Sequence, residues 1–87
     1  MRLKNKVAII TGSASGFGKG IAKKFSEEGA KLILVDINSS LLKKVSKSLS
    51  QQYFVADVSK DSNFKSLLKY TYNKYKTVDI IVNNAGI

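Results

Sequence analysis

The sequence predicts an α/β fold built on a parallel β-sheet. Four short runs rich in Val and Ile recur along the chain, at residues 7–10, 31–36, 53–58 and 78–84. Their apolar residues are consecutive, which is typical of parallel strands that are buried on both faces. Longer segments with helical spacing separate the runs. The resulting order β-α-β-α-β-α-β indicates a parallel sheet with right-handed crossovers.

The three connecting segments have the apolar stripes of amphipathic helices. We expect these helices at about residues 18–28, 40–49 and 61–75. Their stripes consist of Ile21, Ala22 and Phe25 in the first helix, Leu41, Leu42, Val45 and Leu49 in the second, and Phe64, Leu67, Leu68, Thr71 and Tyr75 in the third.

The ends of these segments carry helix start and stop signals. Gly29 follows the first helix, where a glycine with left-handed backbone is common. Asn38 or Ser39 can cap the start of the second helix, and Ser59 or Asp61 can cap the start of the third.

Composition excludes several kinds of site. A chain of 87 residues forms one domain at most, and its 44% hydrophobic content supports a packed core. It has no cysteine and no histidine, so it has no disulfide framework, thiolate metal site, cysteine nucleophile or histidine base. Asp57, Asp61 and Asp79 are expected at a strand end, a helix start and the opposite end of a strand. Because these carboxylates do not converge, we expect no metal site.

The charge is strongly basic, with 15 Lys and Arg against 6 Asp and Glu and a net charge of +9. Such a charge raises nucleic acid and anionic membranes as partners. The lysines are scattered from Lys4 to Lys76, which favours solvated helix faces over a binding block. The N-terminus lacks the apolar stretch of a signal peptide, and no run approaches the roughly 20 apolar residues of a membrane span. We therefore expect a cytoplasmic chain that binds neither nucleic acid nor membranes.

The glycine-rich stretch TGSASGFGKG, residues 11–20, lies between the first strand and the first helix. A helix N-terminus offers free N–H groups to a phosphate, and glycines let the backbone approach it. The ATP-type loop would need glycine at Ser13 and Ser or Thr at Gly20, and the G-x-G-x-x-G fingerprint would need a small residue at Ile21. The pattern that remains is T-G-x-x-x-G-x-G, and Gly20, outside it, is expected to ease helix–sheet packing.

Asp36 is the second signal, because it closes the second strand 18 residues after Gly18. A carboxylate at this position can accept hydrogen bonds from the ribose hydroxyls of NAD and would repel a 2′-phosphate. The plainer alternative is an aspartate that only caps the next helix.

These motifs resemble the N-terminal part of the short-chain dehydrogenase/reductase family. The chain carries four of its segments in order, T-G-S-A-S-G-F-G, V-D-I, A-D-V and N-N-A-G. The resemblance implies a Rossmann-like three-layer fold, truncated after about four parallel strands in the order 3-2-1-4. It also implies that residues 1–87 are the N-terminal part of a single NAD(P)-binding domain whose remainder is absent.

The resemblance further implies a set of cofactor-binding residues. The glycine loop would hold the pyrophosphate, the V-D-I segment the ribose, and the A-D-V segment the adenine, while Asn83 would tie the central strands together. The residues implied to bind cofactor are Gly12, Ser13, Ser15, Gly16, Phe17, Gly18, Asp36, Ile37, Asp57, Val58, Asn84, Ala85 and Gly86. NADP-preferring relatives carry a basic residue in the loop or after the second strand. Here Ser15 and Ile37 occupy those places, so NAD is expected and NADP is disfavoured.

The family's catalytic Ser and Tyr-x-x-x-Lys pair follow the N-N-A-G segment, so the resemblance implies no catalytic residue in this chain. Two Tyr-x-x-x-Lys patterns, Tyr70–Lys74 and Tyr72–Lys76, fall in the third helix instead. Tyr70 would lie about 13 Å from the ligand-binding edge of the sheet. We expect these tyrosines to pack against the fold and the lysines to be solvated.

The expected function is the NAD-binding portion of an oxidoreductase that moves a hydride between NAD(H) and an alcohol or carbonyl substrate. By the resemblance, the full-length protein would be a homo-oligomer, and the chain alone would be inactive. A non-catalytic nucleotide-binding module or subunit is the alternative. Two residues depart from the family pattern. Phe17 replaces a smaller apolar residue, and Lys76 replaces a glycine and would cost up to about 1 kcal/mol in a left-handed conformation.

Overall fold

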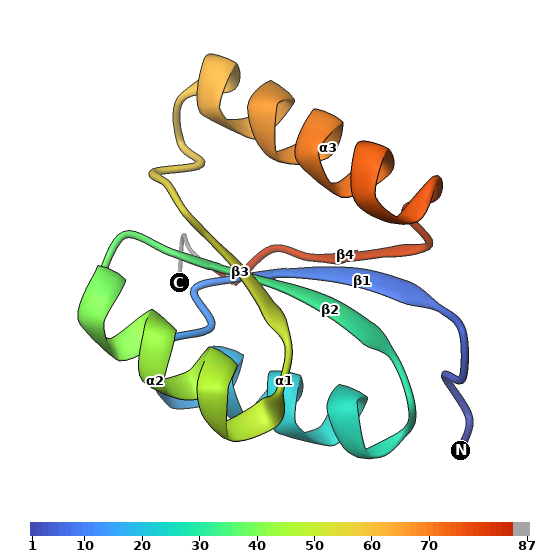
Figure 1. The fold of residues 1–87 in the computed structure, drawn as a ribbon. Helices are drawn as coiled ribbons and strands as arrows, with labels where there is room; N and C mark the ends of the chain where they lie inside the picture. Colours follow the sequence, from blue (N-terminus) through green and yellow to red (C-terminus); the bar gives the residue numbers. More distant parts are fainter. Residues whose placement is uncertain (85–87) are drawn as a thin grey trace.

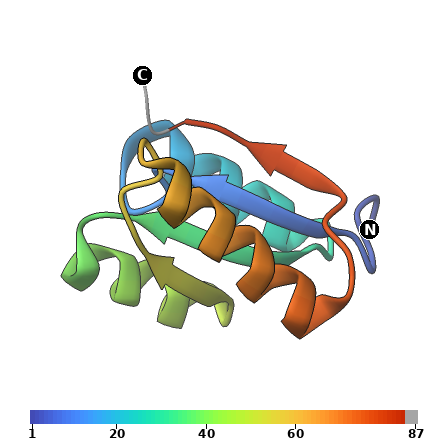
Figure 2. The ribbon, with the colours of Figure 1, turned by 90° about the horizontal axis from the view of Figure 1, so that it is seen from above.

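A computed structural model describes residues 1–84 as a four-stranded parallel sheet with helices on both faces (Figure 1). The strand order is β3-β2-β1-β4, as the family resemblance implied. Figure 2 shows the same layers from above. The elements are β1 (Val7–Thr11), α1 (Gly16–Glu27), β2 (Lys31–Asp36), α2 (Ser39–Leu49), β3 (Gln52–Val55), α3 (Asp61–Tyr75) and β4 (Ile80–Val82). The predicted fold class is therefore confirmed.

The central strands β1 and β2 are buried on both faces, which explains their consecutive apolar residues. Alternate side chains pack to opposite sides. One face, with Ala8, Ile10, Leu32 and Leu34, packs against α1 and α2. The other face, with Ile9, Ile33 and Val35, packs against Leu67 of α3. Burying each of the Leu, Ile and Val side chains contributes about 1.5–3 kcal/mol, so the two central strands are the centre of the core.

The edge strands are shorter than their apolar runs predicted. β3 ends at Val55, and β4 begins only at Ile80. Asp79, just before β4, contacts Val7 through both its backbone and its side chain: its amide donates to the Val7 carbonyl at 2.9 Å, and its carboxylate accepts from the Val7 amide at 2.8 Å. Within residues 1–84 each edge strand has one pairing partner, since β3 pairs with β2 and β4 with β1.

The helix ends agree with some of the predicted signals and contradict one. Gly29 follows α1 with φ +91°, and the Asn38 side chain accepts a hydrogen bond from the Leu41 amide at the start of α2. The predicted cap of α3 is wrong. Lys60 is the N-cap residue and its side chain makes no capping bond, because the Ser59 hydroxyl donates to Asp57 and Asp61 is already inside the helix.

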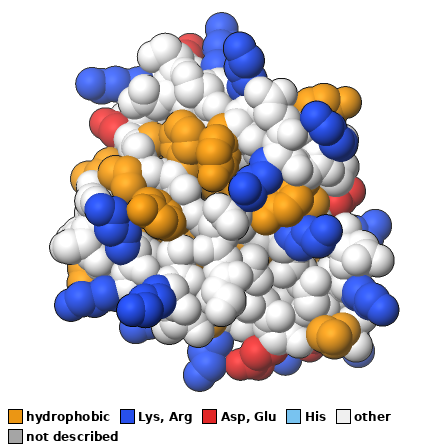
Figure 3. Space-filling view, in the orientation of Figure 1, with side chains coloured by type: hydrophobic (Ala, Val, Ile, Leu, Met, Phe, Trp, Pro, Cys, Tyr) orange, Lys and Arg blue, Asp and Glu red, His pale blue; other side chains and the backbone are white. Residues whose placement is uncertain are grey.

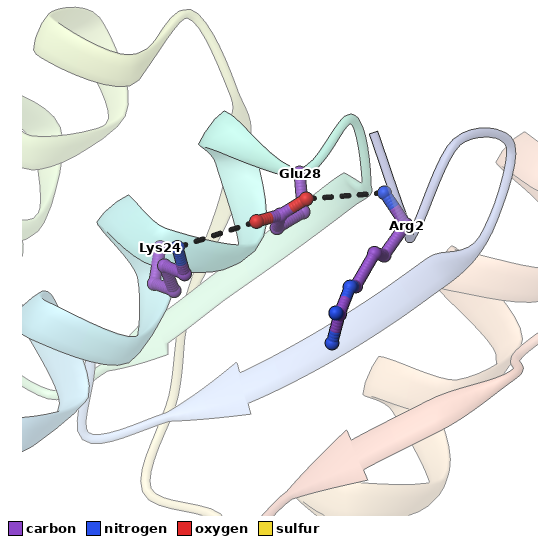
Figure 4. A network of polar contacts seen from close by, with 3 residues as sticks. All are labelled: Arg2, Lys24 and Glu28. Atoms are coloured by element: carbon purple, nitrogen blue, oxygen red, sulfur yellow. Dashed lines mark hydrogen bonds and ion pairs between the residues drawn. The ribbon is translucent and has the colours of Figure 1, made fainter.

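The N-terminal segment is pinned to the end of α1. The Leu3 amide donates to the Glu28 carbonyl at 2.8 Å, and the Arg2 amide donates to the Glu28 carboxylate at 3.1 Å (Figure 4). Lys24, one helical turn earlier, forms an ion pair with the same carboxylate at 3.2 Å. The Arg2 amide donor and the Lys24 charge together hold the pKa of Glu28 below its usual range.

The basic residues are dispersed over the surface. On the face drawn in Figure 3, Lys and Arg side chains lie in several places around apolar groups and do not merge into one patch. No helix in residues 1–84 is long and apolar enough to cross a membrane.

Candidate functional site

A cleft of about 400 Å³ opens at the carboxyl edge of the sheet, where the chain leaves all four strands. In a parallel α/β sheet this edge is where ligands bind. The cleft is lined by Thr11, Gly12, Ser15, Gly16, Phe17, Val35, Asp36, Ile37, Ala56, Asp57, Val58 and Asn84.

The glycine-rich loop depends on glycine at three positions for two different reasons. Gly12 and Gly16 adopt left-handed backbone, with φ of +64° and +59°, which other residues rarely adopt. Gly18 lies directly against the preceding strand end, because a Cβ there would come within 1.9 Å of the Gly12 carbonyl oxygen. The proposed packing role of Gly20 is wrong, since a Cβ there would meet nothing within 4 Å.

The loop leads into a helix start that is left open to a ligand. The Ser15 side chain makes no capping bond, and α1 has no acidic residue in its first turn. The first amides of the helix therefore lack both a side-chain acceptor and a neighbouring negative charge. Such a terminus attracts anions through its free N–H groups and its partial positive charge.

Asp36 lies at the end of β2 and borders the same cleft. Its Oδ2 accepts a hydrogen bond from the Ala14 amide at 3.1 Å, and its Oδ1 accepts one from the Asn38 amide at 3.0 Å. Within residues 1–84 the one ion pair is Lys24–Glu28, so no lysine or arginine neutralises Asp36. Ile37, beside it, is 71% exposed.

Asp57 and Val58 line the part of the cleft beyond β3. The Ser59 hydroxyl donates to Asp57 Oδ1 at 2.6 Å, and the Ser59 amide donates to the same oxygen at 3.0 Å. These two bonds, the hydroxyl first, lower the pKa of Asp57 below its ordinary value. Asp57 is therefore a carboxylate at neutral pH, and its orientation is fixed by the turn that leads into α3.

Thr11 joins the ends of β1 and β4. Its hydroxyl donates to the Asn83 side-chain oxygen at 3.1 Å and accepts from the Asn84 amide at 2.9 Å. The Asn84 side-chain nitrogen lies 3.5 Å from the Gly12 carbonyl oxygen. Asn83 thus ties the end of β1 to the end of the edge strand β4, and Asn84 reaches the glycine loop.

Nine of the expected cofactor-binding residues line the cleft, namely Gly12, Ser15, Gly16, Phe17, Asp36, Ile37, Asp57, Val58 and Asn84. Ser13 and Gly18 are buried behind it. Ala85 and Gly86 lie outside the described residues. The cleft also includes Thr11, Val35 and Ala56, which were not predicted as site residues. Each of these three residues lies at or next to a strand end and directly precedes a predicted site residue, and this adjacency is the signal that the sequence offers for them.

The two Tyr-x-x-x-Lys patterns lie on α3 and its C-cap residue Lys76, and none of their residues lines the cleft. The Tyr70 ring packs against Phe54, with ring centroids 5.2 Å apart, whereas Tyr72 is 58% exposed rather than packed as predicted. No three acidic, cysteine or histidine side chains gather as metal ligands anywhere in residues 1–84.

Comparison with known proteins identifies similar sequences over the whole chain. A family model described as short chain dehydrogenase matches residues 6–87. Zerumbone synthase of Zingiber zerumbet is 45% identical over 91 residues, which cover 100% of this chain and 34% of that protein. Mitochondrial borneol dehydrogenase of Lavandula x intermedia is 40% identical over 86 residues, covering 99% of this chain and 33% of that protein. The chain thus spans about a third of the length of these relatives.

Two solved structures have the same fold. A 3-ketoacyl-(acyl-carrier-protein) reductase from Brucella melitensis, complexed with NADH, aligns with a TM-score of 0.85 and 35% identity over 90% of this chain and 33% of that chain. An oxidoreductase from E. coli aligns with a TM-score of 0.91 and 24% identity over 99% of this chain and 38% of that chain. From the family match and the shared fold, this chain belongs to the short-chain dehydrogenase family, whose members are oxidoreductases with a Rossmann-like region that binds nicotinamide cofactors.

Proposed function

We propose that this chain supplies the adenosine and pyrophosphate side of an NAD site in a dehydrogenase that acts on an alcohol or carbonyl substrate. The observation that carries the proposal is that the Asp36 carboxylate, which no lysine or arginine neutralises, lies in the same cleft as the uncapped, glycine-lined start of α1. The first group suits ribose hydroxyls and the second suits a pyrophosphate. When bound, NAD supplies the hydride chemistry of the reaction.

In this proposal, different residues along the cleft bind different parts of the cofactor. Gly12, Ser13, Ser15, Gly16, Phe17 and Gly18 would form the pyrophosphate loop. Asp36 and Ile37 would face the ribose. Asp57 and the backbone of Val58 would bind the adenine, and Asn84, with Ala85 and Gly86, would face the ribose from the side of β4. The absence of a Cβ at Gly16 and Gly18 favours close approach of a ligand and of the helix, respectively.

NAD is preferred over NADP in this proposal for an electrostatic reason. The described cleft lining contains two carboxylates, Asp36 and Asp57, and no lysine or arginine, although the chain as a whole carries +9. A 2′-phosphate would place about two negative charges beside Asp36 without a cation to neutralise them. Ribose hydroxyls, by contrast, can donate hydrogen bonds to the carboxylate.

Calorimetric titration with ADP-ribose and with its 2′-phosphorylated form tests the preference on the part of the cofactor that this chain would bind. We expect ADP-ribose to bind at least about tenfold more tightly, which corresponds to about 1.4 kcal/mol. The double variant Asp36→Ala/Ile37→Arg should reverse the order, and Ile37→Leu is the matched control that should leave it unchanged. Equal binding of the two ligands by the original chain would contradict the proposal.

The acid–base groups of the reaction are not among residues 1–84 in this proposal. Tyr70 is packed on Phe54, and Tyr72 is exposed on a helix that contributes nothing to the cleft lining. Incubation of the 87-residue chain with NAD and a panel of alcohols should therefore produce no NADH absorbance. NAD-linked turnover that disappears in Tyr70→Phe or Tyr72→Phe would overturn this assignment.

A further inference from the structure

The Asp36 carboxylate holds two different parts of the backbone at once. Its Oδ2 accepts from the Ala14 amide in the glycine-rich loop, and its Oδ1 accepts from the Asn38 amide after β2. We propose that Asp36 is also a positioning residue, which sets the shape of the loop that receives the pyrophosphate. This inference rests on the proposed function and extends it from the ribose to the phosphates.

The loop needs such a contact because its own backbone is permissive. Gly12 and Gly16 both have positive φ and bracket the three residues between them. Two bonds from Ser13, its amide at 3.1 Å and its hydroxyl at 3.3 Å, reach the Val35 carbonyl. Next along the loop, the Ala14 amide reaches Asp36. These bonds fix the loop just before the open start of α1.

Asp36 is itself held firmly enough to serve as an anchor. It is paired with Val55 in the sheet, and its carbonyl oxygen accepts a hydrogen bond from the Ala56 amide at 3.1 Å. The Asn38 amide fixes the second carboxylate oxygen. Hydrogen bonds to a charged acceptor are about twice as strong as neutral ones, so the carboxylate restrains Ala14 more than a neutral group would. The direction of the loop amides thus depends on a side chain of the neighbouring strand.

The two roles of Asp36 predict opposite effects on a ligand that lacks ribose hydroxyls. If Asp36 acts on the ribose alone, its removal leaves the affinity for such a ligand unchanged. The affinity can also rise, because a negative charge near the diphosphate is gone. If Asp36 also shapes the loop, its removal weakens the binding of that ligand. The sign of the change separates loop positioning from both ribose contact and electrostatics.

Calorimetric titration with ADP and with 2′,3′-dideoxy-ADP measures this sign. In Asp36→Ala we expect the affinity for dideoxy-ADP to fall at least about threefold. Asp36→Asn has the same charge as Asp36→Ala but keeps an acceptor oxygen, so it should lose less than about twofold. Unchanged or tighter dideoxy-ADP binding in Asp36→Ala, or equal losses in the two variants, would overturn the inference.

A measurement on the unaltered chain covers the case in which Asp36→Ala does not fold. Amide hydrogen exchange without ligand should be slower at Ala14 than at Gly16 and Phe17, the first amides of α1, which have no acceptor within their helix. Exchange at Ala14 as fast as at Gly16 would also overturn the inference. If ADP fails to bind the original chain, the proposed function itself is wrong. Loop positioning fails alone when ADP binds and the results for dideoxy-ADP or Ala14 disagree.

Discussion

The two edges of the sheet differ in how far side chains satisfy the polar backbone groups. At the amino edge, side chains satisfy the backbone where strands begin: Asp79 accepts from the Val7 amide, and Gln51 accepts from the Leu32 amide and donates to the Ala30 carbonyl. At the carboxyl edge, α1 starts without a capping bond, while α2 beside it is capped by Asn38. The start of α3 also lacks a side-chain cap but carries Asp61 in its first turn, so in the described part of the chain only α1 starts with neither a cap nor an acidic residue. We call the amino edge the closed edge and the carboxyl edge, where the start of α1 can receive an anion, the open edge.

Of the changes at the open edge, Gly18→Ala should have the largest effect on stability and on NAD binding. The new methyl group would lie 1.9 Å from the Gly12 carbonyl oxygen and 2.6 Å from its carbon, both of which are backbone atoms. Because backbone cannot move aside as a side chain does, we expect a loss of about 3 kcal/mol in the free energy of unfolding and loss of NAD binding. Urea unfolding and NAD titration measure the two effects.

Gly20→Ala is the matched control for this change, two residues along the same helix. A methyl group there meets nothing within 4 Å, so alanine should stabilise the helix by about 0.5–1 kcal/mol. If the two substitutions had similar effects, the close approach of α1 to the end of β1 would be wrong.

Gln51→Ala should damage the closed edge without changing ligand preference. The Gln51 side chain receives the Leu32 amide at 2.9 Å and donates to the Ala30 carbonyl and the Ser26 hydroxyl, both at 3.1 Å. Removing it leaves buried backbone groups unpaired, which costs about 2 kcal/mol. Urea unfolding measures the loss. Gln52→Ala, at the exposed neighbour, should change stability by less than about 0.5 kcal/mol. A changed ratio of NAD to NADP affinity in Gln51→Ala would show that the two edges are coupled.

Lys76→Gly, at the closed edge, should raise the free energy of unfolding. Lys76 ends α3 with φ +64°, so the left-handed conformation considered from the sequence is confirmed. Glycine adopts this conformation without strain, and we expect a gain of up to about 1 kcal/mol in urea unfolding. Lys74→Gly, inside the last turn, should have the opposite sign and lose a similar amount. If both substitutions lowered the stability, the Lys76 side chain would contribute more to stability than its left-handed backbone costs.

Local patterns in the sequence predicted most of the fold and the positions around the cleft. The consecutive apolar residues of 31–36 predict a strand that spans Lys31–Asp36 in the structure, and the T-G-x-x-x-G-x-G spacing leads to the loop at the cleft. These features depend on neighbours along the chain. The start of α1 at Gly16 was missed by two residues, because a glycine with positive φ gave no helix signal.

Contacts between distant residues could not be predicted in the same way. The bond from Ala14 to Asp36 and those of Gln51 join residues about 20 positions apart, and their geometry exists only once the strands pair. Ser13 illustrates the limit within the site itself. Its place in the motif suggested a cofactor contact, yet its hydroxyl is turned to the Val35 carbonyl and is buried.

Glu28 offers the smallest and most specific test of the closed edge, through its dependence on pH. Its folded-state pKa lies below the ordinary value of about 4.3, so the unfolded chain binds more protons between the two values. The contribution of Glu28 to stability is therefore complete above about pH 5 and is lost as the pH falls through the folded pKa. The difference in unfolding free energy between the original chain and Glu28→Gln should shrink from pH 7 to about pH 3. Lys24→Gln should weaken this pH dependence without abolishing it, because the bond from the Arg2 amide, the largest single cause of the shift, remains. A difference that stays constant with pH would show that the N-terminal segment does not hold the Glu28 carboxylate in the folded chain.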